Sequence, residues 1–325
     1  MNTNRPFLLC PAAKEYLWGG TRLNDEFNLG LDAYPLAEAW VCSSHPDGQS
    51  IAGGVPLSEV LAAHPEWLGS HPLSVTGGQA ELPILIKLID AKEDLSVQVH
   101  PDDEFALTNE KCLGKTEMWY VLSARPGAQL VYGFREDMTP ERIRCIVKNG
   151  HIGQYLNYVP IHRDDVFLIE AGTVHALGAG CLIAEIQENS NLTYRLYDYD
   201  RMDKDGNKRP LQLEKAMQVA RLSGSTVPRQ PMRVLKYHGG CASEFLMRCR
   251  YFQVERLMLN TEGRKLARFQ AGENSFHALL CVEGCGVLYG DKVMLPFFKG
   301  DCIFVPANSI EMKLHGRAQL LNVSC

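Results

Sequence analysis

The sequence contains no long hydrophobic run. Its longest apolar stretch, Leu82 to Ile89, is interrupted by Lys87, whereas a helix that spans a bilayer needs about 20 apolar residues. The residues after Met1 also lack the apolar core of a secretory signal peptide. From these absences we expect a soluble protein in the cytoplasm.

Clusters of basic residues are also missing. The chain has 33 Lys and Arg against 38 Asp and Glu, and its net charge is −5. Binding to nucleic acid depends on a basic surface that neutralises phosphates, which excludes nucleic acid as the main partner. A small anionic substrate is compatible with this charge, because one or two local cations are enough to bind it.

Eleven cysteines are scattered along the chain, but no C-x-x-C pair occurs. An odd number of cysteines in a long chain without a secretion signal does not indicate a disulfide framework. We therefore predict free, buried thiols in a reducing compartment.

Short strands dominate the predicted secondary structure. Segments of apolar and β-branched residues alternate with Gly, Pro, Asp and Asn, a pattern that predicts a mainly β chain of sandwiches or barrels. The 325 residues are enough for two domains. The predicted strands are Leu82–Asp90, Leu95–Val99, Thr116–Leu122, Gln129–Phe134, Asp165–Ile169, Leu182–Gln187, Thr193–Tyr197, Tyr251–Asn260, Phe276–Val282, Gly286–Tyr289, Cys302–Val305 and Ala318–Val323.

Helices are fewer. Thr139-Pro140-Glu141 combines an N-cap residue, a proline at the first helical position and an acidic first turn. The apolar residues that follow predict a small helical insert at about residues 139–157. Three other segments are helix-like, Ser58–Ala63, Asp102–Asn109 and Leu213–Ala220.

A polar, proline-containing stretch from Gly224 to Pro231 is the predicted linker between two domains. It divides the chain into an N-terminal domain, residues 1–222, and a C-terminal β domain, residues 232–325. The two domains share a weak internal repeat, because residues 164–172 resemble residues 300–308. Two copies of one type of barrel explain this likeness.

Several metal-binding side chains occur at strand positions. Gln98 and His100 are two residues apart, so in a strand both point to the same face. Glu117 begins another strand, and His175 follows a glycine turn. Inward-facing residues of neighbouring strands converge inside a small barrel. Nitrogen and oxygen ligands without thiolates suit a catalytic zinc, or Fe, Mn or Co in its place, but a single histidine in a strand is usually structural.

The order of several motifs gives this pattern its specificity. The first 220 residues or so resemble the short bacterial form of type I mannose-6-phosphate isomerase, a family of the cupin superfamily. The segments that carry the resemblance are Trp18-Gly19-Gly20-Thr21-Arg22-Leu23, Glu38-Ala39-Trp40, Leu82-Pro83-Ile84-Leu85-Ile86-Lys87, Leu95-Ser96-Val97-Gln98-Val99-His100-Pro101, Gly114-Lys115-Thr116-Glu117-Met118-Trp119-Tyr120, Ala171-Gly172-Thr173-Val174-His175-Ala176 and Thr193-Tyr194-Arg195-Leu196-Tyr197-Asp198-Tyr199-Asp200-Arg201.

The resemblance implies two cupin-type jelly-roll barrels and an enzyme that interconverts mannose 6-phosphate and fructose 6-phosphate. It also implies that Gln98, His100, Glu117 and His175 hold one Zn²⁺ per chain, and that Arg195 is catalytic. We expect a zinc ion to act as a Lewis acid and a guanidinium to stabilise negative charge on oxygen.

Other charged residues near the motifs have open roles. Lys115 and Lys87 are candidates for substrate binding. The proton-transfer group cannot be chosen by spacing among Glu188, Asp198, Lys87, Lys115 and Glu38.

The second half of the repeat lacks the ligand pattern. Glu311 aligns with His175, and no Gln-x-His pair precedes it, so we predict no metal in the C-terminal barrel. The predicted chain is a monomer or a homodimer. Two alternatives stay open at this point: another metal-dependent cupin enzyme, such as an iron oxygenase, and a sugar-binding cupin without catalysis.

Overall fold

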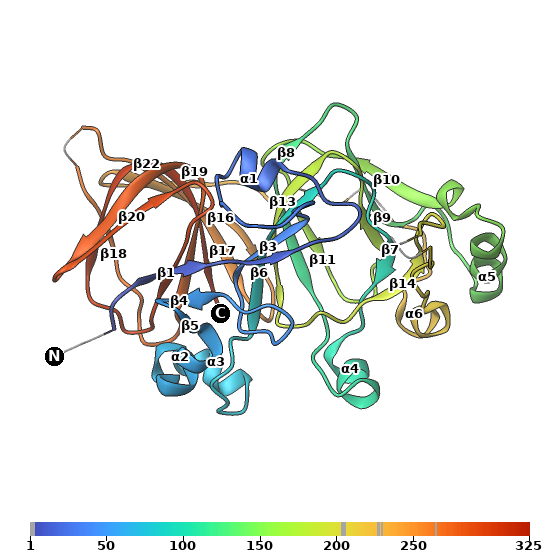
Figure 1. The fold of residues 1–325 in the computed structure, drawn as a ribbon, viewed down its shortest axis with the longest axis horizontal. Coiled ribbons are helices and arrows are strands. Elements are labelled where there is room, and N and C mark those ends of the chain that lie inside the picture. Colours follow the sequence, from blue (N-terminus) through green and yellow to red (C-terminus); the bar gives the residue numbers. More distant parts are fainter. Residues whose placement is uncertain (1–3, 203–205, 226–227, 229, 264) are drawn as a thin grey trace.

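Strands make up most of the secondary structure, and the prediction of a mainly β chain is confirmed. The computed structural model describes residues 4–202, 206–225, 228, 230–263 and 265–325. Its strands form three antiparallel sheets of five, six and eleven strands, and the helices lie at the periphery (Figure 1). None of the helices in these described ranges has the length and apolar character needed to cross a bilayer.

The first two sheets face each other across an apolar core. Ile89 and Trp119 from the six-stranded sheet pack there with Leu130 and Leu177 from the five-stranded sheet. The six-stranded sheet has the order β11 (Val166–Ile169), β8 (Glu117–Ala124), β13 (Cys181–Glu188), β6 (Ile84–Ala91), β3 (Glu38–Cys42) and β2 (Ala12–Lys14). The five-stranded sheet has the order β10 (Leu156–Pro160), β9 (Gln129–Phe134), β12 (His175–Leu177), β7 (Val97–Val99) and β14 (Tyr194–Tyr197).

The third sheet contains strands from both ends of the chain. Its order is β15 (Leu235–His238), β16 (Cys241–Arg248), β17 (Gln253–Asn260), β22 (Met312–Ser324), β19 (His277–Gly290), β21 (Cys302–Val305), β1 (Phe7–Cys10), β4 (Ile51–Ala52) and β5 (Val55–Pro56). Two further strands, β18 (Ala267–Phe269) and β20 (Val293–Phe298), pair with β22 and β19.

The N-terminal strands extend the C-terminal sheet. Phe7 of β1 pairs with Phe304 of β21, so the sheet crosses the predicted boundary between residues 1–222 and 232–325. That division of the chain stays a prediction. Of the predicted linker, residues 226–227 and 229 lie outside the described residues.

One predicted pair of strands is a single strand. The sequence predicts Phe276–Val282 and Gly286–Tyr289 as separate strands, whereas β19 runs through both. The pairing with β22 shifts by one residue between Cys281 and Glu283, and Gly284 has a φ of 76°. The extra residue of this bulge is Val282, and Gly284 pairs with Ala318 just after it, so the glycine continues the strand and does not form a turn that ends it.

Two helices begin with the side-chain caps that their sequences suggest. The Asp102 carboxylate accepts from the Phe105 amide at 2.9 Å, and the Thr139 hydroxyl accepts from the Arg142 amide at 3.2 Å. The predicted insert at 139–157 contains a helix and a 3₁₀ turn, while its last residues already belong to β10. The helical elements are α1 (Arg22–Asp25), α2 (Leu57–Ala63), η1 (Pro65–Trp67), α3 (Ser70–Val75), α4 (Asp103–Asn109), α5 (Pro140–Lys148), η2 (Ile152–Gln154) and α6 (Leu213–Val219).

All eleven cysteines are free thiols. The expectation that they are buried is confirmed for Cys42, Cys181, Cys281 and Cys302 only. Four others are partly exposed, and it is wrong for Cys10, Cys145 and Cys285, which are exposed.

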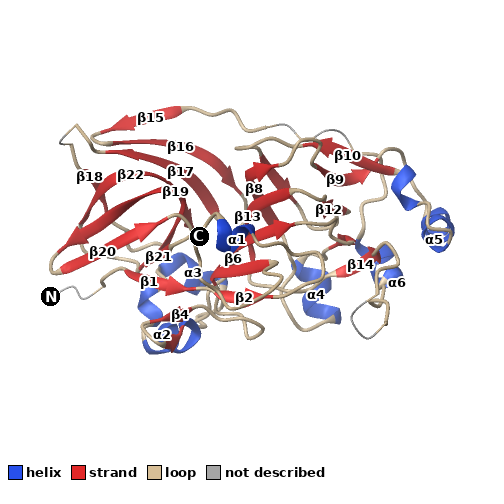
Figure 2. Ribbon diagram, turned by 45° about the horizontal axis from the view of Figure 1, so that its top comes forward, coloured by secondary structure: helices blue, strands red, loops and turns tan. Residues whose placement is uncertain are grey.

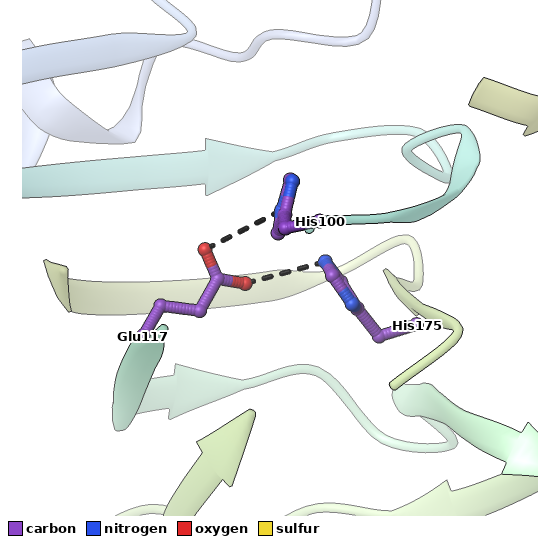
Figure 3. Close-up of side chains that lie close together, drawn as sticks. All are labelled: His100, Glu117 and His175. Atoms are coloured by element: carbon purple, nitrogen blue, oxygen red, sulfur yellow. Dashed lines mark ion pairs between the residues drawn. The ribbon is translucent and has the colours of Figure 1, made fainter. Parts of the chain in front are cut away.

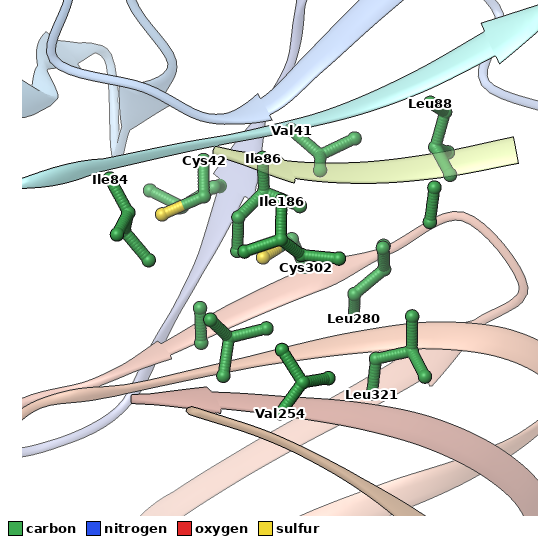
Figure 4. Close-up of a cluster of buried hydrophobic side chains, with 14 of the residues drawn as sticks. Val41, Cys42, Ile84, Ile86, Leu88, Ile186, Val254, Leu280, Cys302 and Leu321 are labelled. Atoms are coloured by element: carbon green, nitrogen blue, oxygen red, sulfur yellow. The ribbon is translucent and has the colours of Figure 1, made fainter. Parts of the chain in front are cut away.

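The outer face of the six-stranded sheet packs against the eleven-stranded sheet (Figures 2 and 4). Ile86 and Leu88 of β6 lie in this apolar interface with Val254 and Leu321. Because side chains alternate along a strand, Lys87 between them points to the opposite face, which is the interior of the first pair of sheets. The apolar run of β6 thus places the buried ammonium group of Lys87 in the interior of the barrel.

Candidate metal centre

Three predicted ligands converge at one end of the first pair of sheets. His100 follows β7, Glu117 opens β8 and His175 opens β12. Their ligand atoms all lie within 4.8 Å of one another. The Glu117 carboxylate faces both imidazoles (Figure 3), with its Oε1 3.3 Å from His175 Nε2 and its Oε2 3.7 Å from His100 Nε2. All three side chains are buried.

Strand register places Gln98 beside this group. Gln98 of β7 pairs directly with His175 of β12 on one side and with Arg195 of β14 on the other. Residues directly opposite each other in an antiparallel pair share a face of the sheet. The side chains of Gln98, His175 and Arg195 therefore project to the same side, toward the barrel interior.

Backbone carbonyls orient both imidazoles. His100 Nδ1 lies 2.8 Å from the Leu192 carbonyl, and His175 Nδ1 lies 2.8 Å from the Thr173 carbonyl. A carbonyl oxygen only accepts, so each Nδ1 donates and each Nε2 keeps its lone pair. Burial lowers the pKa of His175 to about 4, and burial together with Lys115 lowers that of His100 well below its usual range. Both rings are therefore neutral at pH 7, the form that binds a metal.

The donor set fits a divalent cation. Glu117 Oε1 and His175 Nε2 are buried and have no hydrogen-bond partner among the described residues, which is costly unless another group satisfies them. Burial, followed by the charge of Glu185, raises the pKa of Glu117, so a cation there would also compensate its carboxylate. Two imidazole nitrogens with carboxylate and amide oxygens are ligands that zinc accepts.

A cavity of about 270 Å³ adjoins the ligands, and charged side chains line much of it. Glu185 Oε1 lies 3.2 Å from Lys87 Nζ and 3.7 Å from Lys115 Nζ, and its other oxygen accepts from the Trp119 indole at 2.9 Å. The lining residues are Tyr16, Trp18, Glu38, Lys87, Ile89, Leu95, Ser96, Gln98, Lys115, Glu185, Asn191, Thr193, Arg195 and Arg209.

These charges stabilise one another. Burial opposes ionisation, but Lys115 and Lys87 lower the pKa of Glu185. Burial likewise opposes the charge of Lys87, but Glu38 and Glu185 raise its pKa. Lys115 Nζ also lies 2.7 Å from Glu117 Oε2 and 3.3 Å from His100 Nε2, so it joins the cavity to the ligand group.

Arg195 lies in the wall of the same cavity. Its Nε donates to the Ser96 hydroxyl at 3.1 Å and its Nη1 to the Pro210 carbonyl at 3.3 Å. Arg209 lies next to it in the cavity lining and is held by Asp198, which accepts two hydrogen bonds of 2.7 and 2.6 Å from its guanidinium.

The candidates for proton transfer separate into two groups. Glu38, Lys87 and Lys115 line the cavity. Glu188 and Asp198 do not line it. The Glu188 carboxylate accepts from the Thr116 amide instead, and Asp198 forms ion pairs with Arg201 and Arg209. Glu185 and Arg209 also line the cavity, although the sequence did not identify them as candidate site residues. A single acid in the predicted apolar strand Leu182–Gln187 was the available signal for Glu185, and Arg209 had none.

A larger groove of about 570 Å³ lies elsewhere, lined by residues such as His71, Arg248 and Cys325. None of the predicted ligands lines it. The chemistry of the donor atoms, and not the size of the hollow, therefore identifies the candidate site.

Comparisons with known proteins agree with this geometry. A model of the type I phosphomannose isomerase catalytic domain matches residues 7–120, and a model of the mannose-6-phosphate isomerase cupin domain matches residues 242–325. The chain is 35% identical to mannose-6-phosphate isomerase ManA of Bacillus subtilis (strain 168), over 98% of both chains. The chain belongs to the mannose-6-phosphate isomerase family.

Solved structures of mannose-6-phosphate isomerases share the fold. The crystal structure of the Bacillus subtilis enzyme matches with a TM-score of 0.87 at 33% identity, over 98% of this chain and 99% of that one. A mannose 6-phosphate isomerase bound with zinc and yttrium matches with a TM-score of 0.74 at 17% identity, over 98% of each chain. The predicted family is thus confirmed, and the cupin prediction is confirmed for the C-terminal part.

Proposed function

We propose that this member of the mannose-6-phosphate isomerase family holds one zinc ion with Gln98, His100, Glu117 and His175, and interconverts mannose 6-phosphate and fructose 6-phosphate beside it. The observation that carries the proposal is the convergence of two neutral imidazoles and an unsatisfied carboxylate at the wall of a charged cavity. A bound divalent cation supplies Lewis-acid stabilisation of negative charge on substrate oxygen.

The cavity suits a phosphorylated sugar. Four cationic side chains, Lys87, Lys115, Arg195 and Arg209, line it against two carboxylates, Glu38 and Glu185. The excess of positive charge favours a phosphate. We assign the phosphate to Arg209, because a guanidinium donates charge-assisted hydrogen bonds to phosphate oxygens.

Arg195 has the catalytic role in this proposal. Isomerisation moves a proton between C1 and C2 while carbonyl and hydroxyl exchange, so negative charge develops on oxygen. Ser96 and Pro210 hold the guanidinium in a fixed position, where it stabilises that charge without giving up its own proton.

Lys115 and Glu185 are the pair that we assign to proton transfer. They lie 3.7 Å apart, and both line the cavity. Lys87 and Lys115 keep Glu185 ionised, so its carboxylate is able to take a proton from one substrate carbon and return it to the next. Glu38 is the less suitable acid, because among the described residues its ion pair is with Lys87, at 3.8 Å, and not with Lys115, the lysine that contacts the ligand group.

A coupled assay with mannose 6-phosphate and fructose 6-phosphate tests the function. We expect turnover in both directions, loss of turnover when a chelator removes the metal, and recovery when zinc is returned. A metal-loaded protein that binds the sugar phosphate without turnover would instead indicate a binding cupin, and oxygen uptake would indicate an oxygenase. A cytoplasmic location and a monomer or homodimer stay predictions.

A further inference from the structure

The last residues of β13 and the connection that follows them to β14 contact the candidate metal centre on two sides. On one side, the Leu192 carbonyl accepts from His100 Nδ1 at 2.8 Å. On the other side, Glu188 Oε1 accepts from the Thr116 amide at 2.6 Å, one residue before Glu117. One short segment thus contacts both the first histidine ligand and the start of the strand that carries the carboxylate ligand.

Further hydrogen bonds fix the shape of this connection. The Ser190 hydroxyl donates to the Leu113 carbonyl at 2.9 Å. The Gln187 amide donates to the carbonyls of Ser190 and Glu188 at 2.5 and 2.8 Å. Glu188, Ser190 and Gln187 are at most 2% exposed. Buried, multiply bonded backbone of this kind has few alternative conformations, so it can hold the ligands still.

The C-terminal unit contacts the neighbourhood of the loop before β8, which contains Gly114 and Lys115. The Tyr251 hydroxyl, just before β17, donates to Asp103 Oδ2 at 3.0 Å. The other oxygen of Asp103 accepts from the Gly114 amide at 3.0 Å, and the Lys115 amide donates to the Pro101 carbonyl at 3.0 Å. The loop that delivers Lys115 and Glu117 is therefore held at both ends.

Glu188 and Asp103 connect these two sets of contacts. Burial, followed by the charge of Asp103, raises the pKa of Glu188 to about 8. The negative charges of Glu188 and Asp103, after burial, also raise the pKa of Tyr251. The three groups therefore lie close enough to influence one another.

We propose that Glu188 and Tyr251 are positioning residues for the isomerase site: Glu188 fixes Glu117 through the Thr116 amide, and Tyr251 fixes Lys115 through Asp103 and Gly114. The C-terminal unit then contributes to the reaction by holding the loop of the metal centre, although it provides none of the proposed ligands. This inference rests on the proposed function.

Four variants of the zinc-loaded full chain test it. Glu188→Ala removes the acceptor of the Thr116 amide, whereas Glu188→Gln keeps an acceptor oxygen. Tyr251→Phe removes only the hydroxyl that Asp103 accepts, and Tyr237→Phe is the matched control on β15, where the side chain is 78% exposed. For each variant, zinc affinity, kcat and KM, the visible spectrum of the Co²⁺-substituted protein and Tm are measured.

We expect Glu188→Ala to weaken zinc binding by about ten- to a hundredfold, the usual effect of losing a group that orients a ligand, and to change the cobalt spectrum. Glu188→Gln should restore most of the affinity and the wild-type spectrum. Tyr251→Phe should lower kcat by about two- to tenfold, the effect of one hydrogen bond, with little change in KM. Tyr237→Phe should match the wild type in every measurement.

Two results would overturn the inference. One is a folded Glu188→Ala protein with wild-type zinc affinity and cobalt spectrum. The other is a Tyr251→Phe protein whose kcat equals that of Tyr237→Phe, and this remains decisive even if Glu188→Ala does not fold. A wild-type protein that binds no zinc or does not isomerise the sugar phosphate would instead contradict the proposed function.

Discussion

The two turn segments of the internal repeat, residues 164–172 and 300–308, have the same backbone design. In each, an aspartate carboxylate accepts from the backbone amide three residues earlier: Asp165 at 2.7 Å and Asp301 at 2.8 Å. A four-residue strand follows in both, β11 and β21. Each segment begins and ends with a residue of positive φ, which are Asp164 and Gly172 in the first and Gly300 and Asn308 in the second.

The side chains that follow these turns are different. His175 is buried beside Glu117, whereas Glu311, at the equivalent place, forms an exposed ion pair with Arg268 at 3.1 Å. Glu117 pairs with the last residue of β11, and His277 pairs with the last residue of β21. Among the described residues, the cluster of metal-ligating side chains lies beside the first copy, so the backbone of the turn and the chemistry of the side chains that follow it are separable.

The largest expected effect is on zinc binding, when His175 and its equivalent Glu311 are each replaced by alanine. His175→Ala removes a proposed ligand and should weaken zinc binding by more than about a hundredfold, beyond the loss caused by an orienting group, with loss of turnover. Glu311→Ala removes only an exposed ion pair, which contributes at most about 1 kcal/mol. Metal content by mass spectrometry and the isomerase assay measure both.

A loss of zinc from Glu311→Ala as large as that from His175→Ala would contradict the proposed difference between the two copies. His100→Ala is a further check on the ligand set. A metal-free His100→Ala protein with full activity would contradict the assignment of the site.

Arg195→Lys should have the next largest effect. The lysine keeps the charge but loses the planar pair of donors, so we expect kcat to fall by about a hundred- to a thousandfold, as when one transition-state donor is removed. The metal content should not change. Arg268→Lys in the second copy is the matched control, because Arg268 is exposed and pairs only with Glu311 in the contacts described. Unchanged turnover in Arg195→Lys would remove the arginine from the mechanism.

Gly172→Ala and Gly300→Ala compare the backbones themselves. Their φ values are 84° and 100°, and an added Cβ would lie 2.9 Å from the Val219 carbonyl oxygen and 2.6 Å from Leu29 Cδ2. Each substitution should lower the free energy of unfolding by about 1–2 kcal/mol or more, as measured in urea. Only Gly172→Ala should also weaken zinc binding, because the Gly172 amide donates to the His100 carbonyl at 2.8 Å. Equal zinc affinity in the two variants would show that the turn does not support the site.

These turns also show what the sequence could predict about the fold. The strand over Cys302–Val305 is found where it was predicted, because Gly, Asp and Pro mark its ends in the sequence. The long strand β19 was divided in the prediction, because a glycine within a strand and a turn glycine look alike until the partner strand is known.

Only part of the ligand set could be predicted from the strand pattern. Alternation along one strand explains why Gln98 and His100 share a face. It does not bring in His175, whose place depends on the pairing of β12 with β7, or Glu117, which comes from the other sheet. These are non-local facts that only the family resemblance could supply. Glu185 was missed for the same reason, since its lysine partners come from other segments of the chain.

The smallest expected effect concerns His277, which takes the place of Glu117 in the second copy. Burial lowers the pKa of His277, although Asn322, 2.7 Å away, and Glu255 oppose the shift. The folded pKa is therefore below the unfolded value of about 6.5. As the pH falls through 6.5, the unfolded chain binds more protons than the folded one, so the free energy of unfolding decreases.

His277→Gln should reduce this loss between pH 7 and pH 5, by about 1.4 kcal/mol for each unit that separates the two pKa values. Urea unfolding of the metal-free wild type and variant at both pH values measures it, and the difference cancels the contribution of His100 and His175. An identical pH dependence in the two proteins would mean that folding does not lower the pKa of His277. The larger pH dependence in the wild type would show that the second copy has a partly buried histidine in a packing role, where the first copy uses the same strand position for its carboxylate ligand.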